Sequence, residues 1–188
     1  RRILLFMKTV SEGMRSLLFY VGFLEDRITV SSDAADKARY QGLIDVLIPI
    51  AKGYVTDRAF EICSMGLQVF GGYGYTREYP QEQLLRDCRI TQIYEGTNGI
   101  QAMDLLGRKL SLEHGRAFMT LVSEVENTIV QARKDPELAP LADIVHTTLT
   151  HLKETAGKLA GDLGSENILT AFAHAHPFLD VFGDTLMG

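Results

Sequence analysis

The sequence predicts an all-α protein, a helical bundle with an added helical region at its C-terminal end. Two observations lead to this prediction. Apolar residues recur three and four positions apart over long stretches, which gives a helix one apolar face. No window shows the period-two alternation, bounded by turn dipeptides, that is typical of a β-strand. The chain has 188 residues, of which 46% are apolar, so it can bury a substantial core in six or seven helices.

The N-terminal half is predicted to form two long helices. The first carries a stripe of Ile3, Met7, Val10, Met14, Leu17, Val21, Leu24 and Ile28. The second follows cap candidates at Ser31, Ser32 and Asp33 and runs from about Ala34 to Met65. We expect a kink at Pro49, because proline removes a backbone donor and clashes with the preceding turn. Gly66 is the expected stop, before a glycine-rich loop at Gly71, Gly72 and Gly74.

Shorter helices are expected further along the chain. Pro80 opens one that ends near Ile90, since proline is well tolerated in a first turn. Thr97 or Asn98 caps another, which reaches about His114. A stripe of Leu138, Leu141, Val145, Leu149, Leu152, Ala156, Leu159 and Leu163 then indicates a long helix, with Asp135-Pro136 at its start. A last piece, residues 165–187, is interrupted by Pro177.

We divide the chain into two domains, residues 1–112 and 113–188, with a seam near Ser111 to Arg116. The net charge of −5 argues against nucleic acid as a partner, since binding phosphates needs a basic face. Cys63 and Cys88 form no disulfide framework, which favours a reducing, cytoplasmic location. The apolar stretch near the N-terminus is too short for a signal peptide or a transmembrane segment. The chain opens on Arg-Arg-Ile-Leu-Leu without Met, so we expect it to be a piece of a longer protein.

Residues 68–101 carry the most informative motifs. The segment begins Gln-Val-Phe-Gly-Gly-Tyr-Gly-Tyr-Thr-Arg-Glu-Tyr-Pro and ends Leu-Arg-Asp-Cys-Arg-Ile-Thr-Gln-Ile-Tyr-Glu-Gly-Thr-Asn-Gly-Ile-Gln. A lone Gly-Gly pair would be weak evidence, but here several motifs occur in order and at a fixed spacing. Together they resemble the C-terminal helical domain of the acyl-CoA dehydrogenase family. The resemblance extends more loosely back to Arg1 and forward to about Leu110.

The resemblance implies a flavin enzyme that converts an acyl-CoA into a 2-enoyl-CoA. In the family, the glutamate of Tyr-Glu-Gly-Thr removes the α-proton while the β-hydrogen leaves as hydride to FAD; by position this base is Glu95. A thioester α-proton is only weakly acidic, so burial should raise the basicity of the carboxylate, toward roughly pH 6 to 7. We therefore expect Glu95 to lie in a groove, near the glycine loop, rather than on a convex face.

Further site residues follow from the same resemblance. It places Tyr94 and Gly96 at the substrate and Thr97 against the flavin, where a helix N-terminus favours a phosphate-bearing cofactor. The predicted contacts with the FAD of a neighbouring subunit are Gln68, Val69, Phe70, Gly71 and Gly72. A homo-oligomer, dimer or tetramer, is therefore implied, with electron-transfer flavoprotein as the electron acceptor.

Asn98-Gly99 departs from the short members of the family, which often carry Ser-Gln there. The form found here resembles a long bacterial branch that has an added helical C-terminal region, matching residues 111–188. The family's N-terminal helical domain, its middle β-domain and the first helix of its C-terminal domain have no counterpart, so we expect this chain alone to be inactive. The alternative is a non-catalytic helical assembly module that has kept the motif.

Several other residues receive structural interpretations. Arg86 and Asp87 are expected to form an internal ion pair that fixes the turn. Tyr73, Tyr75 and Tyr79 are expected to be packing or interface residues rather than base-stacking ones. His174 and His176 are two positions apart, which suits a metal site on a helix poorly, and no Asp or Glu with matching spacing joins them, so we assign no metal.

Overall fold

The structure is a computed structural model that describes all 188 residues. It contains nine α-helices and no strand, which confirms the predicted fold class. The helices are α1 (Arg2–Val30), α2 (Ala34–Pro49), α3 (Val55–Phe70), α4 (Gln81–Arg89), α5 (Asn98–Gly107), α6 (Arg116–Ala132), α7 (Ala139–Leu163), α8 (Ile168–Ala173) and α9 (Ala175–Met187). A π-helical turn, Ile50–Tyr54, joins α2 to α3, and short 3₁₀ turns cover Gly71–Tyr75, Ile90–Gln92 and Lys109–Gly115.

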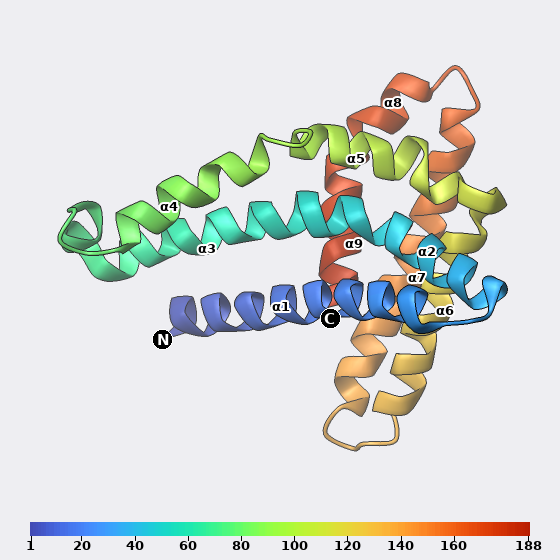
Figure 1. Ribbon diagram of the computed structural model, residues 1–188, viewed down its shortest axis with the longest axis horizontal. Helices are drawn as coiled ribbons and strands as arrows, with labels where there is room; N and C mark the ends of the chain where they lie inside the picture. The colour runs from blue at the N-terminus through green and yellow to red at the C-terminus, as the bar shows by residue number, and fades with distance from the viewer.

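Two helical hairpins extend from a common centre (Figure 1). One is formed by α3 and α4, which pack against each other and end in the glycine-rich turn. The other is formed by α6 and α7. Helix α1 packs on α2 and α3, and the last helix, α9, packs on α5 and on the π turn. The C-terminal helix therefore lies in the middle of the molecule rather than at its edge.

One core holds the centre together. Its 30 buried residues form a single cluster that draws on both sides of residue 112. Leu47, Ile50 and Leu105 come from the N-terminal part, and Leu179 and Phe182 come from α9. All five side chains are at most 1% exposed. The division of the chain into domains at residue 112 stays a prediction, but the two parts share this core.

The second predicted helix differs from the expectation at its end. Pro49 is followed at once by the π turn, so the irregularity lies where proline predicts it. Gly66 does not stop the helix, which runs on to Phe70 and ends at Gly71, with φ +63°. Gly66 instead allows close packing: a Cβ there would lie 2.3 Å from the amide nitrogen of Gln81. That amide donates to the carbonyl of Cys63, 2.8 Å away, and joins α4 to α3.

Other element boundaries also differ. Helix α5 ends at Gly107 rather than near His114, because Arg108 leaves the helical conformation, with φ −128°, and a 3₁₀ turn follows that contains left-handed residues at Glu113 and His114. Helix α6 lies in a stretch where the apolar pattern gave no separate helix. Asp135 accepts from the backbone N–H of Glu137 in a turn, and α7 begins after it at Ala139. The last piece breaks at His174, and Pro177 lies in the first turn of α9.

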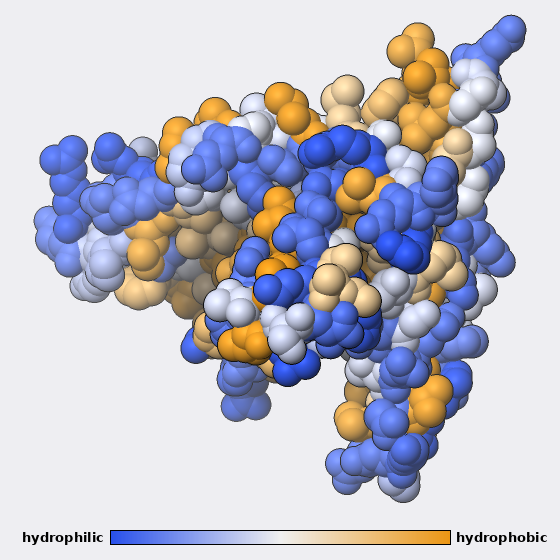
Figure 2. Space-filling view, turned by 45° about the vertical axis from the view of Figure 1, so that its right-hand side comes forward, coloured by the Kyte–Doolittle hydropathy of each residue, from blue (hydrophilic) through white to orange (hydrophobic).

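The surface mixes charged and apolar side chains (Figure 2). Apolar side chains gather over α8, where Leu169 is 81% exposed. Further exposed apolar residues line α1, including Leu5, Phe19 and Phe23. None of the helices has the combination of length and apolar character that a membrane span requires.

A glycine substitution tests the packing of α9. A Cβ at Gly183 would lie 2.3 Å from ring atoms of Tyr54, whose side chain is 2% exposed. We expect Gly183→Ala to lower the free energy of unfolding by about 1–3 kcal/mol, because neither partner can move aside in the core. Gly157→Ala is the matched control in α7, with no atom near the added methyl. It should be neutral or stabilise by up to about 1 kcal/mol in the same urea titration. Equal effects would contradict the packing.

Candidate active site

The loop of Glu95 connects the 3₁₀ turn Ile90–Gln92 to α5. Glu95 has φ +53° and Gly96 has φ +87°, so the chain reverses through two consecutive left-handed residues. This conformation costs about 1–2 kcal/mol for a residue with a Cβ, so the surrounding structure must impose it. Gln101 contributes by donating to the carbonyl of Glu95, 3.2 Å away. Thr97 is the N-cap of α5, as predicted, and its Oγ1 accepts from the N–H of Ile100 at 3.4 Å.

Asn98 anchors the end of this loop to the π turn. Its side chain is 5% exposed, and its Nδ2 lies 3.0 Å from the carbonyl of Gly53, 2.8 Å from Oγ1 of Thr56 and 2.7 Å from Oδ1 of Asp57. Its Oδ1 accepts from Nζ of Lys52 at 2.8 Å. π-Helical turns are frequent at functional sites, because their changed register redirects backbone groups and side chains. Here the turn directs Lys52 and the Gly53 carbonyl to the residue that begins α5.

Lys52 is a cation that contacts the end of this loop, through its bond to Asn98. Burial lowers the pKa of its ammonium group, because desolvation disfavours the charged form. The negative charges of Asp57 and Glu95 act in the opposite direction and raise that pKa. Lys52 therefore contributes a partly desolvated positive charge beside the loop. This role could not be predicted from the sequence, since an isolated lysine in a helix has no distinguishing pattern.

The Glu95 side chain itself is exposed, and it lines none of five surface pockets with volumes of 250–380 Å³. This chain by itself thus leaves the Glu95 side chain exposed, and its position in a groove stays a prediction. Apolar residues nevertheless surround the loop: Ile93, Tyr94 and Ile100 are 48%, 50% and 57% exposed. The backbone N–H of Glu95 has no acceptor within the chain. The loop thus combines an exposed carboxylate, a free donor and exposed apolar side chains within a few residues.

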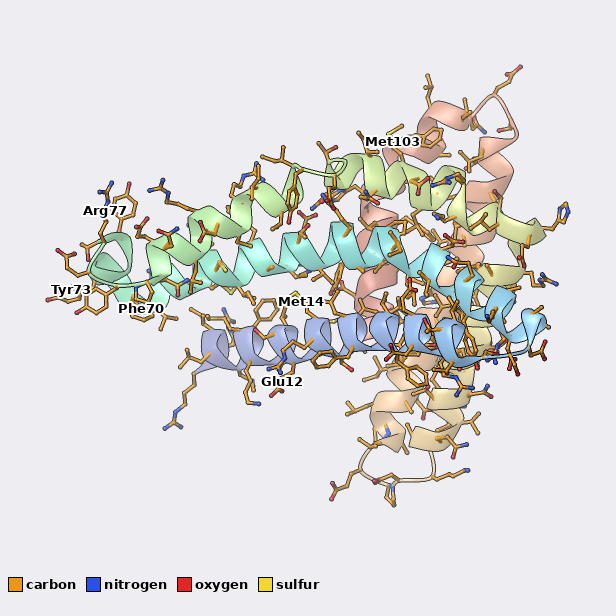
Figure 3. The ribbon with its side chains drawn as sticks, in the orientation of Figure 1. Glu12, Met14, Phe70, Tyr73, Arg77 and Met103 are labelled. Carbon is orange, nitrogen blue, oxygen red and sulfur yellow. The ribbon has the colours of Figure 1, made fainter.

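The glycine-rich turn lies far from this loop. It forms the tip of the α3–α4 hairpin, where Phe70, Tyr73 and Arg77 project away from the rest of the molecule (Figure 3). Asn98 contacts the first turn of α3, and the glycine-rich turn follows its last residue, so the 16 residues of α3 separate them by about 24 Å. The expected proximity of Glu95 to Gln68–Gly72 is therefore wrong. Exposed Val69 and Phe70 leave the tip open to a partner.

The tip is ordered by aromatic contacts. The ring of Tyr79 lies 5.9 Å from that of Phe70 and 5.6 Å from that of Tyr73, in tilted arrangements typical of aromatic pairs. Tyr75 is 83% exposed and makes no such contact. Two of the three predicted packing tyrosines thus pack on each other. No atom lies within 4 Å of the positions where Gly71 and Gly72 would carry a Cβ, so the backbone there is accessible.

Two residues that the motif did not include complete the neighbourhood of Glu95. Asp57, from α3, receives a hydrogen bond from Gln92 as well as from Asn98. Its Oδ2 lies 3.3 Å from Nε2 of His176, on α9. Gln92 precedes the loop and Asn98 follows it, so a single carboxylate holds both ends. Asp57 and His176 are 119 positions apart in a single sequence, and no spacing pattern could have joined them.

Asp57, His176 and Asp180 also form a group whose ligand atoms lie within 4.8 Å of one another. The expectation that no Asp or Glu with matching spacing joins the two histidines is therefore wrong for His176, since Asp180 is one helical turn away on α9. Burial raises the pKa of Asp180, and the charges of His176 and Arg58 oppose that rise. The guanidinium of Arg58 lies 3.7 Å from Asp180, and amide groups already donate to Asp57. The positive charge of Arg58 beside Asp180 disfavours a bound cation, and we assign no metal here.

The predicted ion pair between Arg86 and Asp87 is wrong. Both residues lie on α4, where neighbours in sequence point in different directions. Arg86 instead pairs with Glu82, 3.8 Å away, and Asp87 accepts from Gln83 at 3.0 Å. Cys63 and Cys88 are free thiols that are half-buried rather than fully buried. Burial raises the pKa of Cys63 to about 11, so this thiol is poorly nucleophilic at neutral pH.

Two family profiles match the chain. The one described as "Acyl-CoA dehydrogenase, C-terminal domain" covers residues 27–110, and "Acetyl-CoA dehydrogenase C-terminal like" covers residues 121–188. The chain belongs to the acyl-CoA dehydrogenase family. Over its whole length the chain is 35% identical to 3-methylmercaptopropionyl-CoA dehydrogenase from Ruegeria pomeroyi, and the match covers 32% of that protein. This relative is a long bacterial member of the kind that Asn98-Gly99 predicts. It is also 36% identical to a butyryl-CoA dehydrogenase from Syntrophomonas wolfei, in a match that covers 74% of this chain and 23% of that protein.

Solved structures with the same fold include larger acyl-CoA dehydrogenases. ACDH-11 of Caenorhabditis elegans, in complex with C11-CoA, superposes with a TM-score of 0.79 at 24% identity, covering 98% of this chain and 31% of that one. An acyl-CoA dehydrogenase from Bacillus anthracis, complexed with FAD, superposes with a TM-score of 0.72 at 20% identity, covering 96% of this chain and 32% of that one. The chain therefore spans about a third of the length of the solved proteins whose fold it shares.

Replacing Asn98 tests the anchor of the loop. Asn98→Ala leaves the Lys52 ammonium and the Gly53 carbonyl without their partner in a half-buried site, so we expect the free energy of unfolding to fall by about 2–3 kcal/mol. Ile100→Ala, two residues later on an exposed face, is the control and should change it by less than about 0.5 kcal/mol. Urea unfolding followed by circular dichroism measures both. A similar loss in the two variants would show that Asn98 is no anchor.

Proposed function

We propose that this chain is the C-terminal part of an FAD-dependent acyl-CoA dehydrogenase, which converts an acyl-CoA thioester into the 2-enoyl-CoA with Glu95 as the base. One observation carries the proposal. Glu95 is held in a left-handed conformation, in a loop anchored at both ends, with its carboxylate and its own N–H unpaired. Strain of this kind is frequent at active sites, and at Glu95 it coincides with an unpaired carboxylate, whereas the carboxylate of Glu113, which has a similar φ, pairs with Arg116 at 2.6 Å. The relatives' names, with their acyl-CoA substrates, give the same reaction class.

The loop offers what removal of an α-proton requires. The Glu95 carboxylate takes the proton, and negative charge then develops on the thioester oxygen. The free N–H of Glu95 is a donor that does not need to break another hydrogen bond before it stabilises that charge. Gly96 has no side chain, so the acyl chain can pass close to the backbone. Tyr94 supplies an exposed apolar surface beside it.

Burial of Glu95 must come from outside this chain. Its side chain is exposed here, whereas a base for this reaction needs a desolvated carboxylate. The chain covers 32% of one relative and 23% of another, which leaves most of each protein to form the missing walls. We therefore propose that the substrate and the remaining domains cover the loop, and that this chain alone is inactive.

The residues before α5 fit a flavin. The hydroxyl of Thr97 accepts from Ile100 but donates to no group in the chain, and no atom except Oγ1 of Thr97 lies near the Cβ position of Gly99. Thr97 and the first N–H groups of α5 therefore form an open donor surface, suited to the acceptor atoms of FAD. When FAD is bound, it accepts the β-hydrogen as hydride. Electron-transfer flavoprotein is the proposed acceptor of the electrons.

The distant tip of the α3–α4 hairpin supports an oligomeric enzyme. Since it lies about 24 Å from the Glu95 loop, we propose that Gln68–Gly72 contacts the FAD of a neighbouring subunit rather than the flavin at Glu95. Exposed Val69 and Phe70, with the accessible backbone of Gly71 and Gly72, provide the contact surface. The assembly is a homo-oligomer, either a dimer or a tetramer. Free Cys63 and Cys88 suit a reducing compartment such as the cytoplasm.

Glu95→Gln in the full-length protein tests the base. The amide cannot accept the α-proton, so we expect turnover with an acyl-CoA series to fall by at least about 10²-fold, and α-proton exchange to disappear, while FAD stays bound. Glu113→Gln is the matched control: Glu113 is also exposed and also has a positive φ, +52°. It should retain turnover within about twofold.

One outcome would contradict the assignment. Undiminished turnover in Glu95→Gln would mean that another residue is the base.

Co-expression of this chain with the missing N-terminal portion distinguishes a catalytic part from the alternative, a non-catalytic assembly module. A catalytic part should restore near-full flavin absorbance in the complex, whereas a module that only assembles subunits should associate without restoring it.

A further inference from the structure

The loop of Glu95 is held by a single carboxylate rather than by its own hydrogen bonds alone. Oδ1 of Asp57 accepts from Nε2 of Gln92, before the loop, and from Nδ2 of Asn98, after it, at 2.7 Å. Fixing both ends on one atom limits the conformations that the five residues between them can adopt. The position of the Glu95 carboxylate thus depends on how firmly Asp57 itself is held.

Asp57 is held in turn by the C-terminal region. Its Oδ2 lies 3.3 Å from Nε2 of His176 on α9, and the two side chains are 23% and 46% exposed. One helical turn further along α9, Asp180 faces Arg58, the residue after Asp57, at 3.7 Å. Two adjacent residues of α3 are therefore paired with two residues of α9 that share one face.

Helix α9 also supports the π turn from its inner side. Leu179 is fully buried, and a Cβ at Gly53 would lie 2.7 Å from its Cδ2. The carbonyl of this same glycine accepts from Asn98. The backbone of the π turn is thus packed against Leu179 on one side and bonded to the loop on the other. A shift of α9 would therefore displace the Glu95 loop in two ways: through Leu179 and the π turn, and through His176 and Asp57.

We propose that His176 is a positioning residue for the base: through Asp57 it couples the C-terminal region, residues 121–188, to the Glu95 loop. The effect of this coupling on catalysis rests on the proposed function of Glu95. Its mechanical part, the restraint of the loop by α9 through Asp57, does not. It assigns a task to the added C-terminal helices, which hold the base in register with the substrate. A distortion of about 1 Å at a reacting group can cost about 10²-fold in rate, so such a task is significant for catalysis.

Hydrogen exchange in the full-length flavoprotein tests the mechanical part without turnover. We expect His176→Ala to raise the exchange of amides in residues 93–101 by about three- to tenfold, because the contact between the His176 ring and the Asp57 carboxylate is lost. Amides in the centres of α6 and α7 should be unchanged. His174→Ala, at an exposed histidine two residues earlier, is the control and should leave the loop unchanged.

Kinetics of the same variants distinguish positioning from stability alone. His176→Ala should lower kcat several-fold, with flavin content and KM unchanged. His176→Gln should restore most of kcat, because the glutamine amide places a donor near the position of Nε2. In the background of Asp57→Asn, His176→Ala should have no additional effect on loop exchange, since the residue through which it acts has changed.

Three results would overturn the coupling. Unchanged exchange at residues 93–101 in His176→Ala would show that α9 does not hold the loop. A uniform increase over the whole chain would indicate general destabilisation instead, as would failure of His176→Gln to restore kcat. If Glu95→Gln keeps full turnover while His176→Ala still loosens the loop, the proposed function fails and the mechanical coupling stands.

Discussion

The hydrogen bonds between Asn98 and the π turn organise the centre of this protein. A buried amide needs partners for its donors and its acceptor, and Asn98 finds them on Lys52, Gly53, Thr56 and Asp57. These partners come from barely two helical turns, and the π turn brings them to one face. The loop that precedes Asn98 can then hold Glu95 in a left-handed conformation that it would not adopt in isolation.

The same contacts explain why the C-terminal region cannot be regarded as a simple appendage. Helix α9 contributes Leu179 and Phe182 to the one hydrophobic core, and His176 and Asp180 to the polar contacts beside α3. Tyr54, in the π turn, donates to Asp184 at 2.6 Å, and its ring packs on Gly183. Helix α9 thus makes both apolar contacts and a hydrogen bond with the π turn. These contacts link the stability of the added region to the geometry of the site.

The helical architecture was largely predictable, and the exceptions share a cause. The stripe on α1 between Val10 and Leu24, the role of Pro80 at the start of α4 and the Thr97 cap all rest on local rules, and the structure confirms them. The start of the stripe, at Ile3, is exposed. Gly66 and Pro177 were expected to interrupt helices and do not. Gly66 is in a helix because the packing of Gln81 outweighs its low propensity, and Pro177 lies in a first turn, where its missing N–H has no cost.

The sequence by itself determined the family, the all-α class and the motif that contains Glu95, because spacing along the chain carries all three. Only the tertiary structure decided what surrounds that residue. It separated Glu95 from the Gln68–Gly72 turn by the length of α3, left its carboxylate exposed, and brought Asp57 and His176 together across 119 positions. The physical reason is that helix periodicity reports which face of a helix is buried, whereas the partner of that face is set by the packing of the whole chain.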